Sequence, residues 1–477
     1  MPLLLAGLML VAGRAPAQPL PELGDASANA VPPQMERRIG EDVIREIRYR
    51  DPAYVDDAEV TDYLDALGRQ LLAHVQGVRQ GFEFFAMRDP AINAFALPGG
   101  FVGVNTGLLA LAENESELAS VLAHEIGHVT QHHIARLISA QQQMQVPAMV
   151  ALAAAILLGA SRPDLAAGAA AAVQGGVVQK QLGYSRDFER EADRVGFQTL
   201  QAAGFDVRAM PAFFEKLQRN SRLGDDGTMP GYLRTHPLTA ERIADMQGRA
   251  ANAPYHQHLD SLEFHLIRAK LRAEVGEPLD AVASFEAAVR ERRYANEAAA
   301  RYGLVTARLR ARQLDEARAD LAALRATGAA SPMIETLAAR VQQAAGDESG
   351  ALATLRLALQ RTPGRLPLVY AYAEGLKKAE RNQDVLAALE QPLRQHPDDA
   401  RLRALQARTY AALGKRLLQH QAQAEVYVLR GSVPAAIEQL QLAQTAGDGN
   451  FYELSVVEAR LKQLRAQHAQ EVRDAKR

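Results

Sequence analysis

The sequence contains neither cysteine nor tryptophan among its 477 residues. Without cysteine, the chain cannot form a disulfide, a thiolate zinc site or a lipid-modified N-terminal cysteine, and it cannot use a cysteine nucleophile. Apolar residues make up 48% of the chain and charged residues 23%. These values are typical of a folded, soluble protein, and the length suits about two to four domains.

A strong charge of one sign is also missing, because the formal net charge is −2. The chain up to Pro254 carries 22 basic and 29 acidic residues, and the remainder carries 32 basic and 27 acidic residues. This small positive surplus in the C-terminal half is too weak and too dispersed for a nucleic-acid-binding surface. The sequence therefore predicts no nucleic-acid partner.

The apolar run at the N-terminus is short. Leu3 to Ala12 has the length of a signal-peptide core, and Ala15-Pro16-Ala17 fits a cleavage site. Such a run is too short to span a bilayer. We predict a signal peptide over residues 1–17, cleaved near Ala17, a disordered N-terminus over 18–33, and export to the periplasm.

Two further apolar runs lie at Val146–Ala160 and Leu165–Val178. Both are shorter than the roughly 20 residues that a transmembrane helix needs. We expect buried helices beside the active site. The alternative is a hairpin that touches a client protein or makes a peripheral contact with a membrane.

The residues His124-Glu125-Ile126-Gly127-His128 form an HExxH motif. On a helix, His124 and His128 share one face, four residues apart, and can hold one cation. A Zn²⁺ ion bound by imidazoles lowers the pKa of its bound water to about 7. Glu125 lies beside that face and can take the proton of the water. The motif predicts a zinc-dependent peptide hydrolase with Glu125 as its catalytic base.

A third zinc ligand must come from elsewhere. The extended motif HExxHxxGxxH is excluded, because Gln131 and Ile134 stand where it requires glycine and histidine. His132 lies about 12 Å from His124 along a helix, too far for both to bind one ion. We therefore expect His132 and His133 to be surface or packing residues.

Glu189 and Asp193 are the better candidates, because they are four residues apart on a predicted helix. One of them can bind zinc while the other orients a ligating imidazole. Glu191 points about 200° away from Glu189 around that helix and is the weaker candidate.

These motifs together resemble the HtpX-like and CAAX-prenyl-protease-type zinc metallopeptidases. The resemblance covers Met35 to Ala250, and it is carried by HEIGH (124–128), SRDFEREAD (185–193), THP (235–237), RI (242–243), NAFALPGG (93–100) and TGLL (106–109). It implies a zincin-like α+β fold, Glu189 as the third ligand and Asp193 as its neighbouring support. Similarity to periplasmic members implies unfolded or stalled outer-membrane protein clients and contact with the β-barrel assembly machinery.

The local patterns predict a small sheet among helices. We expect helices at 35–50, 57–75, 116–143 and 185–203 and from Thr239, and strands at 82–87, 92–97 and 101–104. The residues Phe101, Val102, Gly103, Val104 and Asn105 are predicted to form an edge strand that binds an extended substrate peptide. Their alternative role is ordinary core sheet.

The C-terminal half contains a repeat. Five pairs share a turn-prone or polar residue followed by alanine, and the first four are spaced by 36, 34 and 36 residues: Gly276/Ala281, Arg312/Ala317, Gly346/Ala351, Asn382/Ala387 and Gly431/Ala436. A period near 34 is typical of tetratricopeptide (TPR) repeats. The missing tryptophan of the consensus weakens each repeat, and a generic helical bundle is the alternative.

We therefore predict a mainly α protein with two folded parts. Residues 34–254 form a zincin-like α+β metalloprotease domain with a small β-sheet and one Zn²⁺ per chain, and 255–477 form an α-helical TPR solenoid. The rival functions are a TPR chaperone or adaptor with latent proteolysis, and a membrane-embedded protease.

The sequence does not decide which residue donates the hydrogen bond that stabilises the oxyanion. The candidates are His236, Arg234 and Arg242. His236 lies in Leu223–Pro237, which we expect to be a mobile loop. It can alternatively act as a regulatory fourth ligand, because a three-ligand zinc site leaves one position free.

Overall fold

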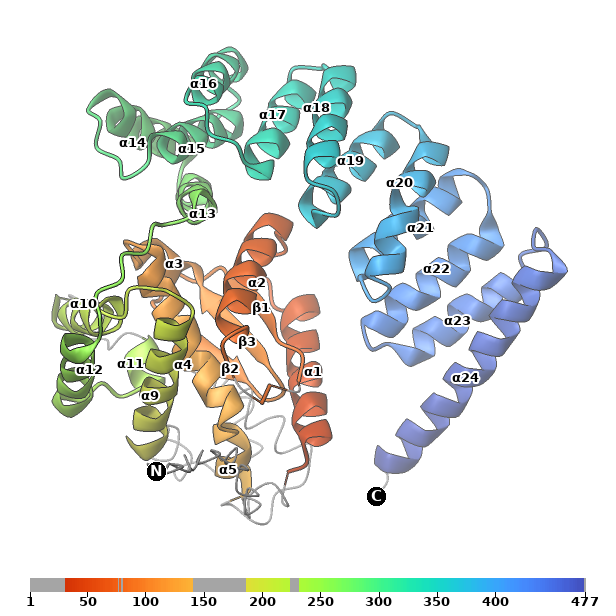
Figure 1. The fold of residues 1–477 in the computed structure, drawn as a ribbon. Coiled ribbons are helices and arrows are strands. Elements are labelled where there is room, and N and C mark those ends of the chain that lie inside the picture. The colour runs from red at the N-terminus through yellow and green to blue at the C-terminus, as the bar shows by residue number, and fades with distance from the viewer. Residues whose placement is uncertain (1–30, 76, 79, 140–185, 224–230, 476–477) are drawn as a thin grey trace, which may run out of the picture.

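The computed structural model describes residues 31–75, 77–78, 80–139, 186–223 and 231–475 (Figure 1). The predicted signal peptide and both later apolar runs lie outside these residues. No helix in the described ranges is long and apolar enough to cross a membrane. The elements of the N-terminal part are α1 (Pro33–Arg50), α2 (Ala58–Leu72), β1 (Glu83–Met87), β2 (Ala94–Leu97), β3 (Phe101–Asn105), α3 (Thr106–Leu111), α4 (Glu115–Thr130), α5 (His133–Ser139), α9 (Arg186–Ala202), α10 (Ala209–Leu223), α11 (Gly231–Thr235) and α12 (Ala240–Asn252).

The sheet has the strand order β1-β3-β2, so the strand at Phe101–Asn105 is central. It runs parallel to β1 and antiparallel to β2. The prediction that Phe101–Asn105 forms an edge strand is therefore wrong, because β3 pairs with a strand on each side. The physical reason is the tight connection between β2 and β3, where Gly99 and Gly100 adopt φ angles of 77° and 99°. This turn folds β3 back beside β2, and the parallel pairing with β1 occupies its other side.

Both faces of the sheet are covered by helices, as the alternation of side chains along the strands requires. Phe84, Val102 and Val104 belong to the same buried cluster as α2 and α4. Phe85 and Phe101 face the other way and pack with the apolar side of α1. Burial of both faces makes the three short strands a fixed base for α4, which carries the HExxH motif.

Helix α4 is shorter than the sequence predicts. Asn114 caps its first turn by accepting a hydrogen bond from the backbone N–H of Glu117. The helix ends at Thr130, and α5 begins at His133 after a turn in which His132 adopts a φ of 51°. The predicted single helix over 116–143 is therefore wrong, because this left-handed residue breaks it. The break changes where His133 points.

Helices α4 and α9 pack at close range through two glycines. A Cβ atom on Gly127 would lie 3.1 Å from the carbonyl oxygen of Ala192, and one on Gly196 would lie 3.0 Å from the backbone nitrogen of His124. No larger residue fits either position without displacing backbone. This close approach brings the side chains of Glu189 and Asp193 to the HExxH face.

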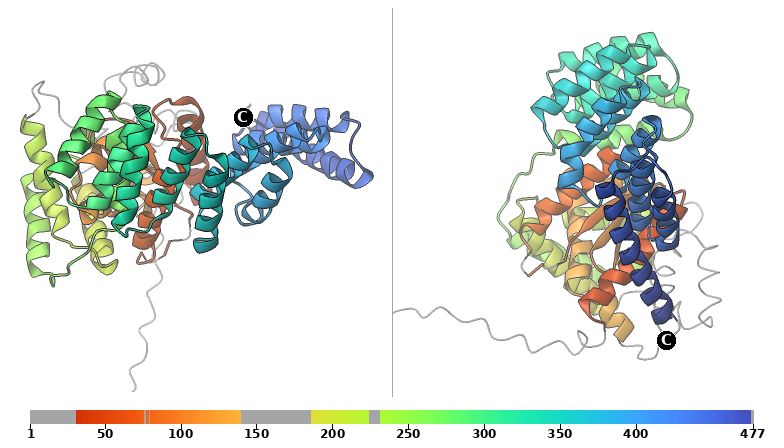
Figure 2. Two further views of the ribbon diagram at one scale, coloured as in Figure 1. Left: turned by 90° about the horizontal axis from the view of Figure 1, so that it is seen from above. Right: turned by 90° about the vertical axis from the view of Figure 1, so that its right-hand side faces the viewer.

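Helices α13 to α24 form successive antiparallel pairs that curve around the N-terminal part (Figure 1), and the last of them extend beyond it (Figure 2). Their bounds are α13 (Leu262–Glu274), α14 (Pro278–Arg290), α15 (Glu297–Arg310), α16 (Leu314–Ala326), α17 (Pro332–Ala344), α18 (Glu348–Arg361), α19 (Leu366–Lys378), α20 (Asn382–Gln395), α21 (Ala400–Ala412), α22 (Arg416–Leu429), α23 (Val433–Gln444) and α24 (Phe451–Ala475).

The turn inside each pair contains a residue with positive φ, and these residues recur at 276, 312, 346, 380, 414 and 447, at spacings of 36, 34, 34, 34 and 33. Two of the predicted repeat positions are out of phase. The turn residue of the fourth pair is Glu380 rather than Asn382, and Val385 is buried there in place of the exposed Ala387. Gly431 lies between α22 and α23, in the connection between two pairs.

The helical pairs share a core with the N-terminal part. One buried cluster runs from Val55 to Val341 and contains residues of α2, α4, α13, α15 and α17. At its edge the Lys270 ammonium of α13 is buried between the carboxylates of Asp57 and Glu59, at 2.5 and 2.6 Å. The two parts are therefore joined by continuous packing as well as by ion pairs.

Candidate metal centre

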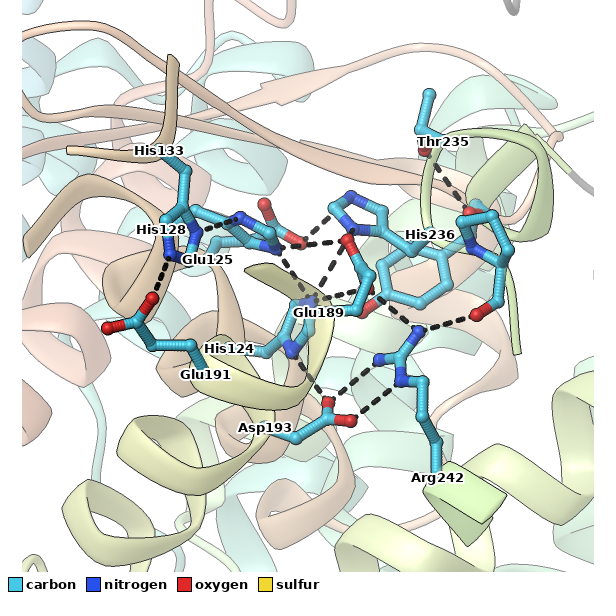
Figure 3. A network of polar contacts seen from close by, with 12 residues as sticks. His124, Glu125, His128, His133, Glu189, Glu191, Asp193, Thr235, His236 and Arg242 are labelled. Atoms are coloured by element: carbon cyan, nitrogen blue, oxygen red, sulfur yellow. Dashed lines mark hydrogen bonds and ion pairs between the residues drawn. The ribbon is translucent and has the colours of Figure 1, made fainter. Parts of the chain in front are cut away.

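Four buried side chains meet between α4, α9 and the end of α11. They are His124 and His128 of α4, Glu189 of α9 and His236, and one potential ligand atom of each lies within 4.8 Å of all the others. None of the four is more than 1% exposed. Figure 3 shows them converging on one point. The structure thus brings together the three predicted zinc ligands and the predicted regulatory histidine.

The atoms that face this point are imidazole nitrogens and carboxylate oxygens. The Nε2 atoms of His124 and His128 are 2.9 Å apart, and each lies 3.5 Å from an oxygen of Glu189. The Nδ1 atom of His236 lies 3.0 Å from Glu189 Oε1 and 3.4 Å from His124 Nε2. Nitrogen and carboxylate donors in a tight, water-excluded cluster are the set that zinc prefers.

Glu125 lies beside the cluster and is completely buried. Neither oxygen of its carboxylate accepts a hydrogen bond from a described residue, although His236 Nε2 lies 3.5 Å from Oε1. Burial raises the pKa of Glu125 above its ordinary value, against the opposing effect of His236. A buried carboxylate without hydrogen bonds is costly. It fits a group that awaits a proton donor, such as an activated water.

Asp193 and Arg242 hold the outer side of His124. Asp193 Oδ1 lies 2.9 Å from His124 Nδ1, and the Arg242 guanidinium donates hydrogen bonds to both oxygens of Asp193 at 2.7 and 2.8 Å. Burial lowers the pKa of His124, but Asp193 and Glu189 outweigh it and raise that pKa to about 9. Arg242 also lies 2.8 Å from Glu189 Oε2, so one cation orients both carboxylates of α9.

His133 is buried and stacks on Phe188, as the packing role predicted for it requires, but both of its ring nitrogens also face polar groups. It is 0% exposed, and its Nδ1 lies 2.8 Å from Nδ1 of His128. Its Nε2 lies 3.2 Å from Glu191, which Arg136 also contacts at 2.9 Å. Burial lowers the pKa of His133 to about 4, so the ring stays neutral. His132, in contrast, is partly exposed and lies 3.0 Å from Glu36, as a surface residue would.

His236 is held by a short helix rather than a mobile loop. Residues 224–230 lie outside the described ranges, but α11 covers most of the remaining predicted loop. The backbone N–H of His236 donates to the carbonyl of Tyr232 at 2.7 Å, and the two rings lie 4.6 Å apart. Tyr232 was not predicted from the sequence; it is buried, and its hydroxyl bonds to no described residue.

The other two oxyanion candidates do not point into the centre. Arg234 is exposed, and the guanidinium of Arg242 is occupied by Asp193 and Glu189. Of the predicted donors only His236 is a member of the cluster, whereas Arg242 contacts Glu189 from outside it. Tyr232, whose ring lies 4.6 Å from that of His236, is a further candidate that the sequence did not indicate.

Comparisons with known proteins agree with this geometry. The family model of peptidase family M48 matches residues 58–250. The beta-barrel assembly-enhancing protease of Escherichia coli (strain K12) is 32% identical over 458 residues, which are 94% of this chain and 92% of that protein. The protein of the same name from Yersinia pestis is 31% identical over 466 residues, 95% and 93% of the two chains. The mitochondrial metalloendopeptidase OMA1 of Arabidopsis thaliana is 30% identical over 223 residues, 46% and 42% of the two chains.

Proposed function

The chain belongs to peptidase family M48, and on that basis we propose that it is a zinc-dependent endopeptidase of the periplasm that cleaves unfolded or stalled outer-membrane β-barrel proteins. The observation that carries the chemistry is the buried group of His124, His128, Glu189 and His236 around one point. The substrate class is supported by relatives that are named for β-barrel assembly and align over nearly the whole chain.

We assign one Zn²⁺ per chain to His124, His128 and Glu189. When bound, the ion supplies Lewis-acid activation of a water and of the scissile carbonyl. Glu125 takes the proton of the attacking water and delivers it to the leaving amine, because its carboxylate is buried and accepts no other described hydrogen bond. Asp193 keeps His124 in the tautomer whose Nε2 is free to act as a ligand, and Arg242 keeps Asp193 in place.

An extended substrate is better placed along β2 than along β3. Within the described residues β2 pairs with β3 on one side only, but all four of its residues are buried and the N–H of Tyr232 donates to the carbonyl of Ile92 just before it. The N–H and C=O groups on its other side therefore become available to a substrate strand when the segments that cover them, α11 among them, move away. Asn93, immediately before β2, has a buried carboxamide whose donor and acceptor bond to no described residue. Main-chain recognition of this kind gives affinity with little sequence preference, which suits a protease of unfolded clients.

His236 acts as a latch in the resting enzyme. Its Nδ1 faces the ligand atoms while its Nε2 faces Glu125, so the ring occupies the space between metal and base. In this position the imidazole ring of His236 excludes the catalytic water from the site. Proteolysis then requires α11 to move, and the resting protein can act on clients as a chaperone or adaptor through its helical pairs, which we assign to TPR repeats. A solenoid of this kind offers an extended surface to clients and to the β-barrel assembly machinery.

The decisive experiment combines zinc content and proteolysis of casein in wild type and Glu125→Gln. We expect the variant to keep its zinc and to lose at least 10²–10⁴-fold in turnover, because a general base contributes roughly that factor. A chelator should abolish wild-type cleavage. Retained cleavage in the variant, or loss of zinc together with activity, would refute the assignment.

A further inference from the structure

The two histidines of the HExxH motif are supported in different ways on the side away from the cluster. His124 faces a carboxylate directly, since its Nδ1 lies 2.9 Å from Asp193. His128 faces the imidazole of His133, with 2.8 Å between the two Nδ1 atoms. A carboxylate stands behind this second imidazole, at 3.2 Å from His133 Nε2 to Glu191. Figure 3 shows the resulting row of three side chains.

The tautomer of each ring in this row is fixed by its neighbour. A neutral imidazole has one N–H and one lone pair, and a metal ligand must present the lone pair. The Nε2 atom of His128 faces the ligand cluster, so its proton is on Nδ1 and is donated to His133. Nδ1 of His133 must then accept, so its own proton is on Nε2 and is donated to Glu191. The Arg136 guanidinium, 2.9 Å from the same Glu191 oxygen, keeps that acceptor in position.

We propose that His133 is a positioning residue for the metal centre, which fixes the tautomer and ring orientation of His128 through its Nδ1 atom. The proposal rests on the zinc site proposed above. The break after α4 is what makes the contact available. On an uninterrupted helix, His133 would point about 140° away from His128. The left-handed conformation of His132 turns α5 so that the side chain of His133 returns to the ligand.

The competing explanation is that His133 only fills space. Its ring stacks on Phe188 with a centroid separation of 4.5 Å and an interplanar angle of 9°. Arg136 lies over the other aromatic ring of this stack, 4.5 Å from the centroid of Phe188. A phenylalanine at position 133 would preserve that packing. It would offer no acceptor to His128, so the two explanations predict different zinc affinities for the same variant.

The experiment measures Zn²⁺ affinity of the full chain by competition with a chromogenic chelator, together with the melting temperature of the zinc-free protein. His133→Phe should bind zinc about 10–100-fold more weakly, the loss typical for removing a hydrogen-bond partner of a ligand. Its zinc-free melting temperature should stay near that of wild type. His132→Asn is the matched control, because asparagine tolerates the left-handed conformation and this position does not contact the cluster.

Two further variants separate the two nitrogens of the ring. The Oδ1 of His133→Asn takes the place of Nδ1 and should keep zinc affinity within a few-fold of wild type. His133→Gln places its amide near the position of Nε2 and should bind as weakly as His133→Phe. This comparison decides the matter even if the phenylalanine variant fails to fold. Equal affinities of the asparagine and glutamine variants would overturn the proposal.

The proposed function can fail separately from this role. A wild-type chain that takes up no zinc would remove the metal site itself. Stoichiometric zinc in wild type, with unchanged affinity in His133→Phe, would overturn only the role of His133.

Discussion

The ion pairs that join α13 to α2 allow a quantitative test of how the two parts of the chain depend on each other. Lys270 is 3% exposed, and its ammonium contacts Asp57 and Glu59. In Lys270→Met both carboxylates lose their cation. Asp57 cannot turn to solvent without giving up its role as the N-cap of α2, where it accepts from the backbone N–H groups of Glu59 and Val60. Glu59 is also held, by the hydroxyl of Thr336.

Removing one partner of a buried pair typically costs about 3–5 kcal/mol. We expect the lower end, about 3 kcal/mol, because the side chain of Asp57 is 25% exposed and keeps part of its hydration. Lys378→Met is the control. The side chain of Lys378 is 61% exposed and its ammonium pairs with Glu348, so its loss should cost at most about 1 kcal/mol. Urea unfolding followed by circular dichroism gives both values.

Because α2 packs against α4 in the shared core, the destabilised junction should also release zinc at lower urea concentration. For the same reason, a chain that ends at Pro254 should not hold zinc stably, since it exposes the apolar surfaces that α13, α15 and α17 cover. Equal urea midpoints for Lys270→Met and Lys378→Met, or a soluble, zinc-loaded truncated chain, would refute the idea of one joint core.

Three further predictions concern single side chains. Glu189→Ala should lose its bound zinc. Glu191→Ala should still bind one zinc ion per chain, with an affinity at most about tenfold weaker than that of wild type. Equal zinc loss from both variants, measured by atomic absorption, would contradict the ligand assignment. His236→Ala should keep its zinc and cleave casein faster than wild type, and slower cleavage with unchanged zinc would exclude the latch. Burial raises the pKa of Asp57, but Lys270 outweighs it and the pKa falls below 3.8. The stability that Asp57 contributes is therefore present above pH 3.8 and is lost as the pH falls through the lower folded-state pKa. In Asp57→Asn, the urea midpoint should therefore fall less steeply at acidic pH than it does in wild type.

Much of the metal centre could be predicted because its side chains are tied to helical spacing. His124 and His128, and likewise Glu189 and Asp193, are four residues apart, and a regular helix places such pairs on one face. His133 could not be predicted in this way, because its position depends on a break in the helix that no glycine or proline announces.

The strand order of the sheet and the exact positions of the repeat turns could not be predicted from the sequence for a similar reason. Alternating residues identify three strands, and the tight turn at Gly99 and Gly100 makes β2 and β3 neighbours, but the parallel pairing of β1 with β3, which puts β3 in the middle, leaves no local signal. In the repeats, Glu380 adopts the left-handed conformation that Gly276 and Gly346 adopt in other pairs. Residue type alone therefore pointed to the wrong position, and only the recurrence of backbone conformation gives the phase.

Because α4 and α9 are in close contact through Gly127 and Gly196, a zinc ion bound at the proposed site would have a second role. It would act as a cross-link between the two helices in a chain that has no cysteine. His128 and Glu189 are separated by 61 residues along the sequence. In the chain-entropy treatment used for disulfides, a cross-link that closes a loop of that length lowers the conformational entropy of the unfolded chain. The effect stabilises the folded state by about 4 kcal/mol. A thiol reductant would leave this cross-link intact, whereas a chelator would remove it. Zinc would thus hold together the segments on either side of residues 140–185, and the folded lifetime of the protein would depend on metal supply rather than on redox conditions.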